Sequence, residues 1–172
     1  MLFTNHMLAG ALLGRVVRKP GAAFAAGLAS HVVMDVLPHW GRWDEAELLR
    51  VARVDGLVAL ALSTGAVAGA GGTRSSTIAA MAGAGLLDLD KPGRHFVGRS
   101  PFPRVVDRWH AWIQVDAERR TRWWAEAVAA GTLAAALAQT RRRTVTVGPE
   151  PRARRGPAAL GSRRPSRRRS SP

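Results

Sequence analysis

The fold is decided by the stretch Gly27-Leu-Ala-Ser-His-Val-Val-Met-Asp-Val-Leu-Pro-His-Trp40. It closes an apolar run, residues 21–37, in which His31 and Asp35 stand four residues apart. Side chains at this spacing are neighbours on one face of a helix. His39 comes four residues later, just after Pro38, which favours the end of a helix because it has no amide hydrogen to donate. The stretch therefore predicts an apolar helix that carries ionisable side chains on one face.

Four further apolar segments accompany this one, so that the chain has five in all, at residues 7–17, 21–37, 57–72, 77–87 and 123–138. The second, third and fifth approach the ~17 residues that a membrane-spanning helix needs. The first and fourth are shorter and fit a re-entrant segment or a helix packed inside a bundle. Segments 57–72 and 123–138 have almost no charged face, whereas a water-soluble helix shows a polar stripe.

A body of about 140 residues is too small to bury five such helices. We therefore expect an all-α fold, a small polytopic transmembrane helical bundle of four to five apolar helices. The alternative is a soluble helical protein, because Ala and Gly are only weakly hydrophobic and the mean hydropathy is −0.06.

The net charge of +14 is concentrated at one end of the chain. Residues 141–172 contain 11 Arg and one acid, which leaves 15 basic and 11 acidic residues in 1–140, a net of +4. The tail is rich in Pro, Gly, Ser and Arg, a composition typical of disorder. We divide the chain into a helical membrane domain with a metal site, 1–140, and a disordered Arg-rich tail, 141–172. The tail is expected to contact anionic lipid. A nucleic-acid partner is disfavoured, since no aromatic residues are interleaved to stack on bases.

The distribution of basic residues also predicts an orientation. Arg15, Arg18 and Lys19 lie between the first two apolar segments, and the Arg-rich tail follows the last. Short loops rich in Lys and Arg stay in the cytoplasm. We expect a multi-pass protein of the inner cell membrane with a cytoplasmic C-terminus. Five crossings place the basic connection 91–122 outside, whereas four crossings remove that conflict, so the number of crossings stays open.

Segment 103–122 is expected to be an amphipathic helix at the membrane interface. One face of this helix carries Val105, Val106, Trp109, Trp112 and Ile113, and Trp is enriched at the headgroup level. The alternative is an amphipathic helix on a soluble core. His110 is interpreted as an interfacial residue rather than as a metal ligand. The absence of Cys excludes disulfides, Cys-ligated zinc and a thiol nucleophile.

Ionisable residues inside or beside apolar segments are the candidates for chemistry. One Asp near the centre of a bilayer costs about 2.5–3.5 kcal/mol. Such residues must therefore lie near the interface, pair with one another or bind a cation. His and carboxylate side chains together suit a divalent ion, with zinc or manganese favoured. The candidate metal ligands are His6, His31, Asp35, His39, Asp88 and Asp90.

A carboxylate that does not bind metal can act as a general base, and Asp35 and Asp55 are the candidates. Simpler roles compete with these assignments. Asp55 fits the N-cap of the third apolar segment, Lys91 can neutralise the Asp88–Asp90 pair, and His6 alone fits a packing residue.

Short motifs resemble the bacterial membrane-bound, metal-dependent hydrolases of the YdjM type over about residues 4–92. The matching motifs are Asn5-His6 with Ala9-Gly10 and Gly14, Ser30-His31-x3-Asp35-x2-Pro38-His39, and Leu86-Leu-Asp-Leu-Asp90. Leu87 stands where the family pattern has Pro, and Lys91 stands where a His often follows. The resemblance implies a membrane bundle rich in small residues and a metal-dependent hydrolase.

Two functions follow as hypotheses. The first is a membrane-embedded, metal-dependent hydrolase that acts on a phosphoester or lipid-like substrate through a His/Asp metal site. The alternative is a non-enzymatic integral membrane protein with a structural or interaction role, in which the His and Asp residues only pair with one another.

Overall fold

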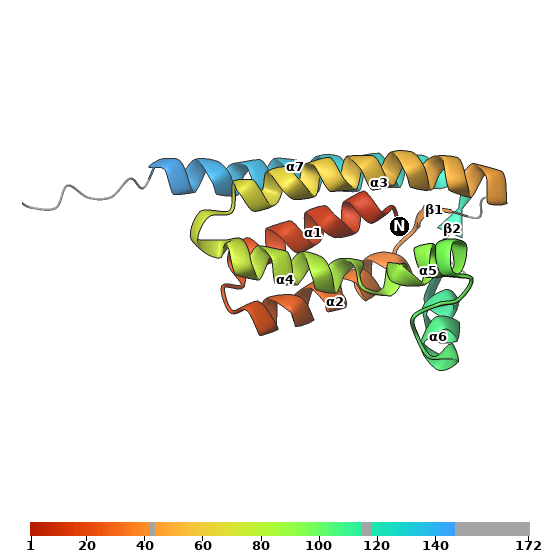
Figure 1. Cartoon of the computed structure of the whole chain (residues 1–172). Helices are drawn as coiled ribbons and strands as arrows, with labels where there is room; N and C mark the ends of the chain where they lie inside the picture. Colours follow the sequence, from red (N-terminus) through yellow and green to blue (C-terminus); the bar gives the residue numbers. More distant parts are fainter. Residues whose placement is uncertain (42–43, 115–117, 147–172) are drawn as a thin grey trace, which may run out of the picture.

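The chain is described by a computed structural model that covers residues 1–41, 44–114 and 118–146. These residues form α1 (Phe3–Val16), α2 (Pro20–Val36), α3 (Glu45–Ala68), α4 (Arg74–Gly85), α5 (Asp90–Val97), α6 (Arg104–Gln114) and α7 (Trp123–Thr146) (Figure 1). The described strands are β1 (His39–Trp40) and β2 (Glu118–Arg119), which pair in parallel. Three 3₁₀ turns complete the list, η1 (Gly71–Thr73), η2 (Leu87–Leu89) and η3 (Arg120–Arg122). The predicted all-α class is confirmed.

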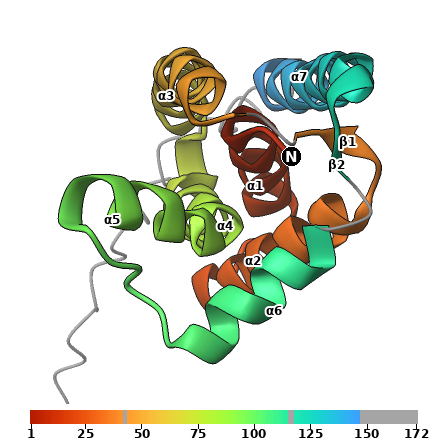
Figure 2. The ribbon, with the colours of Figure 1, turned by 90° about the vertical axis from the view of Figure 1, so that its right-hand side faces the viewer.

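Helices α1, α2, α3, α4 and α7 run side by side and alternate in direction between two ends of the molecule (Figure 1). One end carries the N-terminus, the β1–β2 pair, α5 and α6. The other end carries the α1–α2 and α3–α4 connections and the C-terminal end of α7. Helix α1 is central and contacts α2, α3, α4 and α7 (Figure 2).

Glycines let α4 approach α1 and α2 at backbone distance. A Cβ atom on Gly14 would lie 2.3 Å from the Cα of Thr77, and one on Gly27 would lie 2.0 Å from the carbonyl oxygen of Ala80. Gly10 and Gly14 form a Gly-x-x-x-Gly pair on α1, which is the arrangement that brings helices together in membranes. Neither contact leaves room for a side chain, so these residues fix the distances between the three helices.

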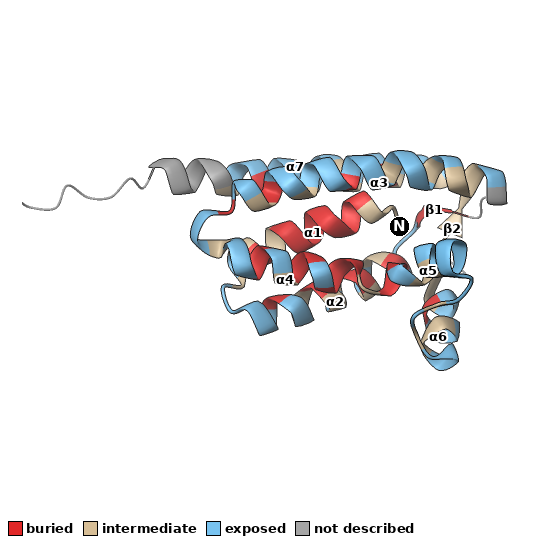
Figure 3. Ribbon diagram, viewed as in Figure 1, coloured by how far each residue is buried: buried red, intermediate tan, exposed pale blue. Residues whose placement is uncertain are grey.

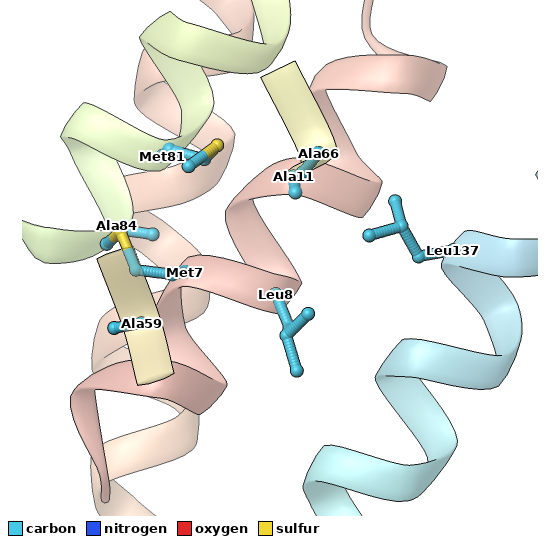
Figure 4. Packing of buried hydrophobic residues seen from close by; sticks show 8 residues of the cluster. All are labelled: Met7, Leu8, Ala11, Ala59, Ala66, Met81, Ala84 and Leu137. Carbon is cyan, nitrogen blue, oxygen red and sulfur yellow. The ribbon is translucent and has the colours of Figure 1, made fainter. Parts of the chain in front are cut away.

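The apolar core is small and surrounds α1 (Figure 4). It consists of Met7, Leu8, Ala11, Ala59, Ala66, Met81, Ala84 and Leu137. At the far end of α1, the Arg15 guanidinium donates to the carbonyl oxygens of Leu137 and Ala66, at 3.2 Å each. Carbonyls in the last turn of a helix have no partner within the helix, and cations are favoured there. Arg15 therefore joins α1 to the last turn of α3 and to a more central turn of α7.

The most deeply buried large side chains are polar, whereas many large apolar side chains are exposed (Figure 3). The buried set is His6, His31, His39, Asn5, Thr77, Asp35 and Ser76. On α3, the exposed fractions of Leu57 and Leu60 reach 71% and 65%. In most folded proteins such polar groups lie at the surface, so their burial here needs a specific reason.

One helix of the described residues is long and apolar enough to cross a membrane, Ala46–Ala68 in α3, and only 11% of its most apolar window is buried. The 24 residues of α3 span about 36 Å, more than the hydrocarbon core of a bilayer. The crossing of a membrane by several helices remains a proposal.

Three element boundaries differ from the sequence expectations. Segment 103–122 is not one helix. Helix α6 ends at Gln114, and Glu118 and Arg119 form strand β2, which pairs with His39 and Trp40. Helix α3 begins at Glu45 rather than near residue 57, because the Asp44 side chain caps it by accepting from the amide of Glu47 at 2.9 Å. Helix α7 continues to Thr146, past the predicted boundary at 140, since residues 141–146 contain no Gly or Pro. The rest of the predicted tail lies outside the described residues.

Substitution of Gly27 tests the close packing of α2 and α4. Gly27→Ala places a methyl group against the backbone of Ala80 and should lower the free energy of unfolding by about 1–3 kcal/mol. The matched control is Gly131→Ala on α7, where a Cβ meets nothing within 4 Å. This control should be neutral or stabilising by up to ~1 kcal/mol through helix propensity. Thermal unfolding in detergent measures both, and equal effects of the two variants would contradict the packing argument.

Candidate metal centre

Three histidines and two aspartates meet at the end of the bundle that holds the N-terminus. His6 comes from α1, His31 and Asp35 from the last turns of α2, Asp88 from η2 and His110 from α6. His6, His31 and Asp35 have no exposed surface, His110 is 3% exposed and Asp88 is 7% exposed. Residues from four separate elements thus form one buried polar cluster.

The Asp35 carboxylate is at the middle of this cluster. Its Oδ1 lies 3.2 Å from His6 Nε2 and 3.0 Å from the Met1 amino group. Its Oδ2 lies 3.1 Å from both His31 Nε2 and His110 Nε2, and accepts a hydrogen bond of 2.6 Å from the Gln114 amide. His31 and Asp35 are neighbours because they are four residues apart on one helix, as the sequence predicts.

The tautomer of His31 is set by α4. Its Nδ1 lies 2.6 Å from the carbonyl oxygen of Ala84, which can only accept, so Nδ1 carries the proton. In the neutral imidazole, Nε2 is then a lone pair that faces the carboxylate of Asp35. Two acceptors so close together require either a second proton on the ring or a cation between them. A backbone carbonyl on the outer nitrogen is the usual support of a metal-binding histidine.

His6 is the buried residue with the least protein support. Neither of its ring nitrogens has a hydrogen-bond partner among the described residues, although the side chain has no exposed surface. A buried polar group without a partner costs about 1–3 kcal/mol. Because His6 Nε2 faces Asp35 and, at 3.9 Å, Oδ2 of Asp88, a bound cation satisfies this nitrogen.

Asp88 is held ionised by its surroundings. Burial raises the pKa of Asp88, but the Lys91 ammonium and the imidazoles of His6 and His31 outweigh burial and hold this pKa at about 2. Lys91 donates to Oδ1 of Asp88, which leaves Oδ2 turned toward His6. The predicted neutralisation of Asp88 by Lys91 is therefore present, and one carboxylate oxygen remains free for a cation.

Helix ends add to the preference for positive charge. The C-terminal ends of α2 and α4, which end at Val36 and Gly85, both point at the cluster. The C-terminus of a helix carries partial negative charge. Two such ends and two carboxylates attract positive charge, which the Met1 amino group at Asp35 and Lys91 at Asp88 already supply in part.

The donors present fit a divalent metal ion. Two groups of donor atoms lie within 4.8 Å of one another, His6–His31–Asp88 and His31–Asp35–His110. Their closest separations, 3.1–3.2 Å, match the ~3.3 Å between ligands of a tetrahedral ion with bonds of about 2.0–2.1 Å. Imidazole with carboxylate suits zinc and manganese. These buried His and Asp groups can hold a metal ion, as the sequence predicts.

Two of the predicted ligands lie beside the cluster rather than in it. His39 is fully buried in β1, where its Nδ1 donates to the carbonyl oxygen of Leu37 and its Nε2 lies 3.8 Å from Glu118. Burial raises the pKa of Glu118, but His39 and Lys91 together hold it below its ordinary value. Asp90 begins α5 and lies 3.9 Å from Arg94. Neither His39 nor Asp90 belongs to the donor groups described above.

Asp55 stabilises the start of α1. Its Oδ2 accepts from the amide of Phe3 at 2.7 Å, and its Oδ1 accepts from the amide of Thr4 at 3.1 Å. It is therefore not the N-cap of its own helix, since α3 begins ten residues earlier, at Glu45. Both carboxylate oxygens satisfy amides in the first turn of α1, which have no partner within the helix. Asp55 positions the turn that carries His6.

His110 and Gln114 are the site residues that the sequence interpretation missed. His110 was expected at the membrane interface, but it is buried and lies 3.1 Å from Asp35. The apolar face of α6 is turned outward, with Val105 and Trp112 exposed by 65% and 71%. The sequence signal that could have indicated their role is their spacing, because His110 and Gln114 stand four residues apart on the polar face of an amphipathic helix.

A groove of about 900 Å³ lies on the other side of the first turn of α1, between α3 and α7. Its apolar walls are Val51, Val54 and Val58 of α3 and Ala127 and Ala130 of α7. Its polar end is lined by Trp40, Arg50, Trp123 and the Arg120–Glu47 ion pair of 3.2 Å. Asn5, the neighbour of His6, forms part of the floor and donates to buried Glu126 at 2.6 Å.

Comparisons with family models, with curated proteins and with solved structures give no match for this chain.

The role of Asp55 can be tested by substitution. Asp55→Ala removes two acceptors and a negative charge from the start of α1, and should lower the free energy of unfolding by about 1–2 kcal/mol. Asp55→Asn, which keeps one acceptor oxygen, should lose less. Both variants should still bind metal after refolding, as measured by elemental analysis. Full stability together with complete loss of activity in Asp55→Ala would instead indicate that Asp55 is a general base.

Proposed function

We propose that this protein is a membrane-embedded, metal-dependent hydrolase that acts on a phosphoester or lipid-like substrate. The proposal is carried by the buried cluster of three His and two Asp, in which His6 Nε2 and Nδ1 have no hydrogen-bond partner among the described residues. The motif resemblance to the YdjM-type hydrolases points the same way, and most of the cluster residues belong to those motifs. Perturbed, buried ionisable groups of this kind concentrate at functional sites.

A divalent ion, when bound, lowers the pKa of a coordinated water and polarises a phosphoryl or acyl oxygen. The residues of the chain supply the metal ligands and the groups that orient them. His6, His31, His110 and Asp88 offer ligand atoms, and the carbonyl of Ala84 fixes the ring of His31. Asp35 holds the imidazoles of α1, α2 and α6 around one carboxylate. Lys91, which is 46% exposed, offers a positive charge to an anionic substrate at the edge of the site.

The distribution of polar and apolar side chains supports a bundle in the inner membrane. Large apolar side chains cover the outside of α3, and polar ones fill the interior. The connection between α1 and α2 contains Arg18 and Lys19, and it lies at the same end of the molecule as the C-terminal end of α7 (Figure 1). Under the positive-inside tendency this end is cytoplasmic, so the metal centre is at the opposite face. The Arg-rich tail after residue 146 lies outside the described residues, and its contact with anionic lipid is part of the proposal.

The groove between α3 and α7 favours a lipid-like substrate. It has apolar walls along its length, while Trp and Arg side chains line one end. Trp is enriched at the headgroup level, and Arg pairs with phosphate. This arrangement complements an acyl chain with a polar headgroup, since Glu47, Asp55 and Glu126 line the groove beside Arg50 and Arg120. Only the first turn of α1 separates the groove from His6.

Removal of a metal ligand tests the proposed activity. His31→Ala should lose bound zinc or manganese and lower the rate of phosphoester hydrolysis by more than about 100-fold, the upper range for residues that only support a metal. The control His95→Ala removes an exposed histidine of α5 that contacts Phe96 and should change neither. Metal content is measured by elemental analysis of purified protein, and activity with long-chain and water-soluble phosphoesters. A chelator should abolish activity, and added Zn²⁺ or Mn²⁺ should restore it.

The non-enzymatic alternative makes the opposite forecast. An integral membrane protein with a structural or interaction role needs no ion and no hydrolysis. This alternative is favoured if the purified wild-type protein contains no divalent metal and if its function is unaffected by His31→Ala and Asp35→Ala. That result would contradict the hydrolase.

Cysteine labelling tests the proposed orientation, because the natural chain has no Cys. Arg99→Cys is exposed between α5 and α6, and Gly72→Cys is exposed between α3 and α4, where a Cβ meets nothing within 4 Å. In intact cells, a membrane-impermeant maleimide should label Arg99→Cys at once and Gly72→Cys only after permeabilisation. Labelling of both from the same side would contradict the bundle topology, and labelling only of Gly72→Cys would invert it.

A further inference from the structure

We propose that the cluster binds two divalent cations and that Asp35 bridges them, with one carboxylate oxygen on each. This inference rests on the proposed metal-dependent function and specifies the centre that carries it. Three features of the cluster support two ions: the placement of the two Asp35 oxygens, the relative orientation of His6 and His31, and the number of remaining donors.

The two oxygens of Asp35 face different partners. Oδ1 lies 3.2 Å from His6 Nε2 and 3.0 Å from the Met1 amino group. Oδ2 lies 3.1 Å from both His31 Nε2 and His110 Nε2 and accepts a hydrogen bond from Gln114. If all three imidazoles bound one ion, one oxygen of the carboxylate would suffice to join them. Instead, His6 approaches one oxygen, and His31 and His110 approach the other. A carboxylate that bridges two metal ions has its ligands divided in this way.

The rings of His6 and His31 are stacked, with centroids 4.0 Å apart and planes inclined by only 17°. Both Nε2 atoms approach the same carboxylate, so the two rings point in the same direction. The lone pair of an imidazole nitrogen lies in the plane of its ring, so two stacked, nearly parallel rings hold their lone pairs in separate planes that do not meet at one ion. They point to two positions separated by about the ring spacing, and ions of two-metal hydrolytic sites are about 3.5–4 Å apart.

The remaining donors divide between these two positions. His110 joins His31 and Oδ2, since its Nε2 lies 3.2 Å from that of His31. Asp88 joins His6 and Oδ1, since its Oδ2 lies 3.9 Å from His6 Nε2 while Lys91 holds its Oδ1. Each position thus has three protein donors and keeps sites open for water or substrate, as catalytic metal centres do.

The charge of such a centre selects the substrate class. Two divalent cations exceed the charge of the Asp35 and Asp88 carboxylates by two positive charges, and the Met1 amino group and Lys91 add to this excess. A phosphate monoester carries a comparable negative charge, and paired ions clamp the attacking and leaving oxygens in phosphoryl transfer. The inference therefore favours phosphoester over carboxylic ester substrates for the proposed hydrolase.

Manganese titration of the full-length protein tests the number of ions. Chelator-treated protein in detergent should bind two Mn²⁺ per chain by elemental analysis. Its electron paramagnetic resonance spectrum should show exchange coupling between the two ions rather than the six lines of an isolated ion. His6→Ala and His110→Ala remove one ligand from opposite positions, so each should retain one Mn²⁺ with an uncoupled six-line spectrum. His95→Ala should keep two coupled ions.

The outcomes separate this inference from the function on which it rests. One Mn²⁺ per chain with a six-line spectrum in the wild type overturns the bridged pair and leaves the metal-dependent hydrolase in place. No bound Mn²⁺ overturns both. Circular dichroism checks that the variants fold, and if they do not, the stoichiometry and coupling in the wild type decide the question alone.

Discussion

The arrangement of the site end of the molecule depends on one buried charge, the carboxylate of Asp35. An ionised carboxylate without compensation in an apolar interior costs more than the whole stability of a small domain. Here the Met1 amino group lies 3.0 Å from one carboxylate oxygen, and the Gln114 amide donates to the other at 2.6 Å. The imidazoles of His6 (α1), His31 (α2) and His110 (α6) surround the carboxylate within 3.2 Å. Because these partners belong to different elements, satisfying one carboxylate fixes how α1, α2 and α6 meet. The close backbone contacts of α4 with α1 and α2 bring these partners within reach.

Burial of polar side chains and exposure of large apolar ones are found in other parts of the fold as well. Polar side chains occupy the interior, and the small core of Ala, Met and Leu fills only the space around α1. Large apolar side chains are exposed on the outer faces of α3 and α6, which agrees with the proposed membrane location. Helix α6 shows the effect most directly, since its Trp residues face outward and its His and Gln face the site. An amphipathic helix packed on a water-soluble core has the opposite orientation.

Much of the site was predictable from the sequence because its decisive pairs are local. The spacing of His31 and Asp35 within an apolar segment implies one helix face, and the cost of burial implies a shared partner for His6 and Asp88. His110 was not predictable in this way, because its role depends on which face of α6 turns inward, and that is decided by the surroundings. The role of Asp55 was hidden for a related reason, since it caps a helix distant in sequence, through the amides of Phe3 and Thr4. Likewise, the short parallel pairing of Glu118 with His39 is a tertiary contact without a local signal.

The glycine contacts of α1, α2 and α4 have a consequence for how this sequence can vary. At Gly14, Gly27 and Gly83 a single added carbon would meet the backbone of a neighbouring helix at 2.0–2.3 Å. These helices also carry or adjoin His6, His31 and Asp88, so such a change displaces the donors as well as the packing. The outer face of α3 has no comparable restriction, and one large apolar residue can replace another there. Tolerance to mutation should therefore differ between helix faces. The small residues on the inner faces should accept almost no substitution, whereas the apolar residues on the outer faces should exchange freely with one another.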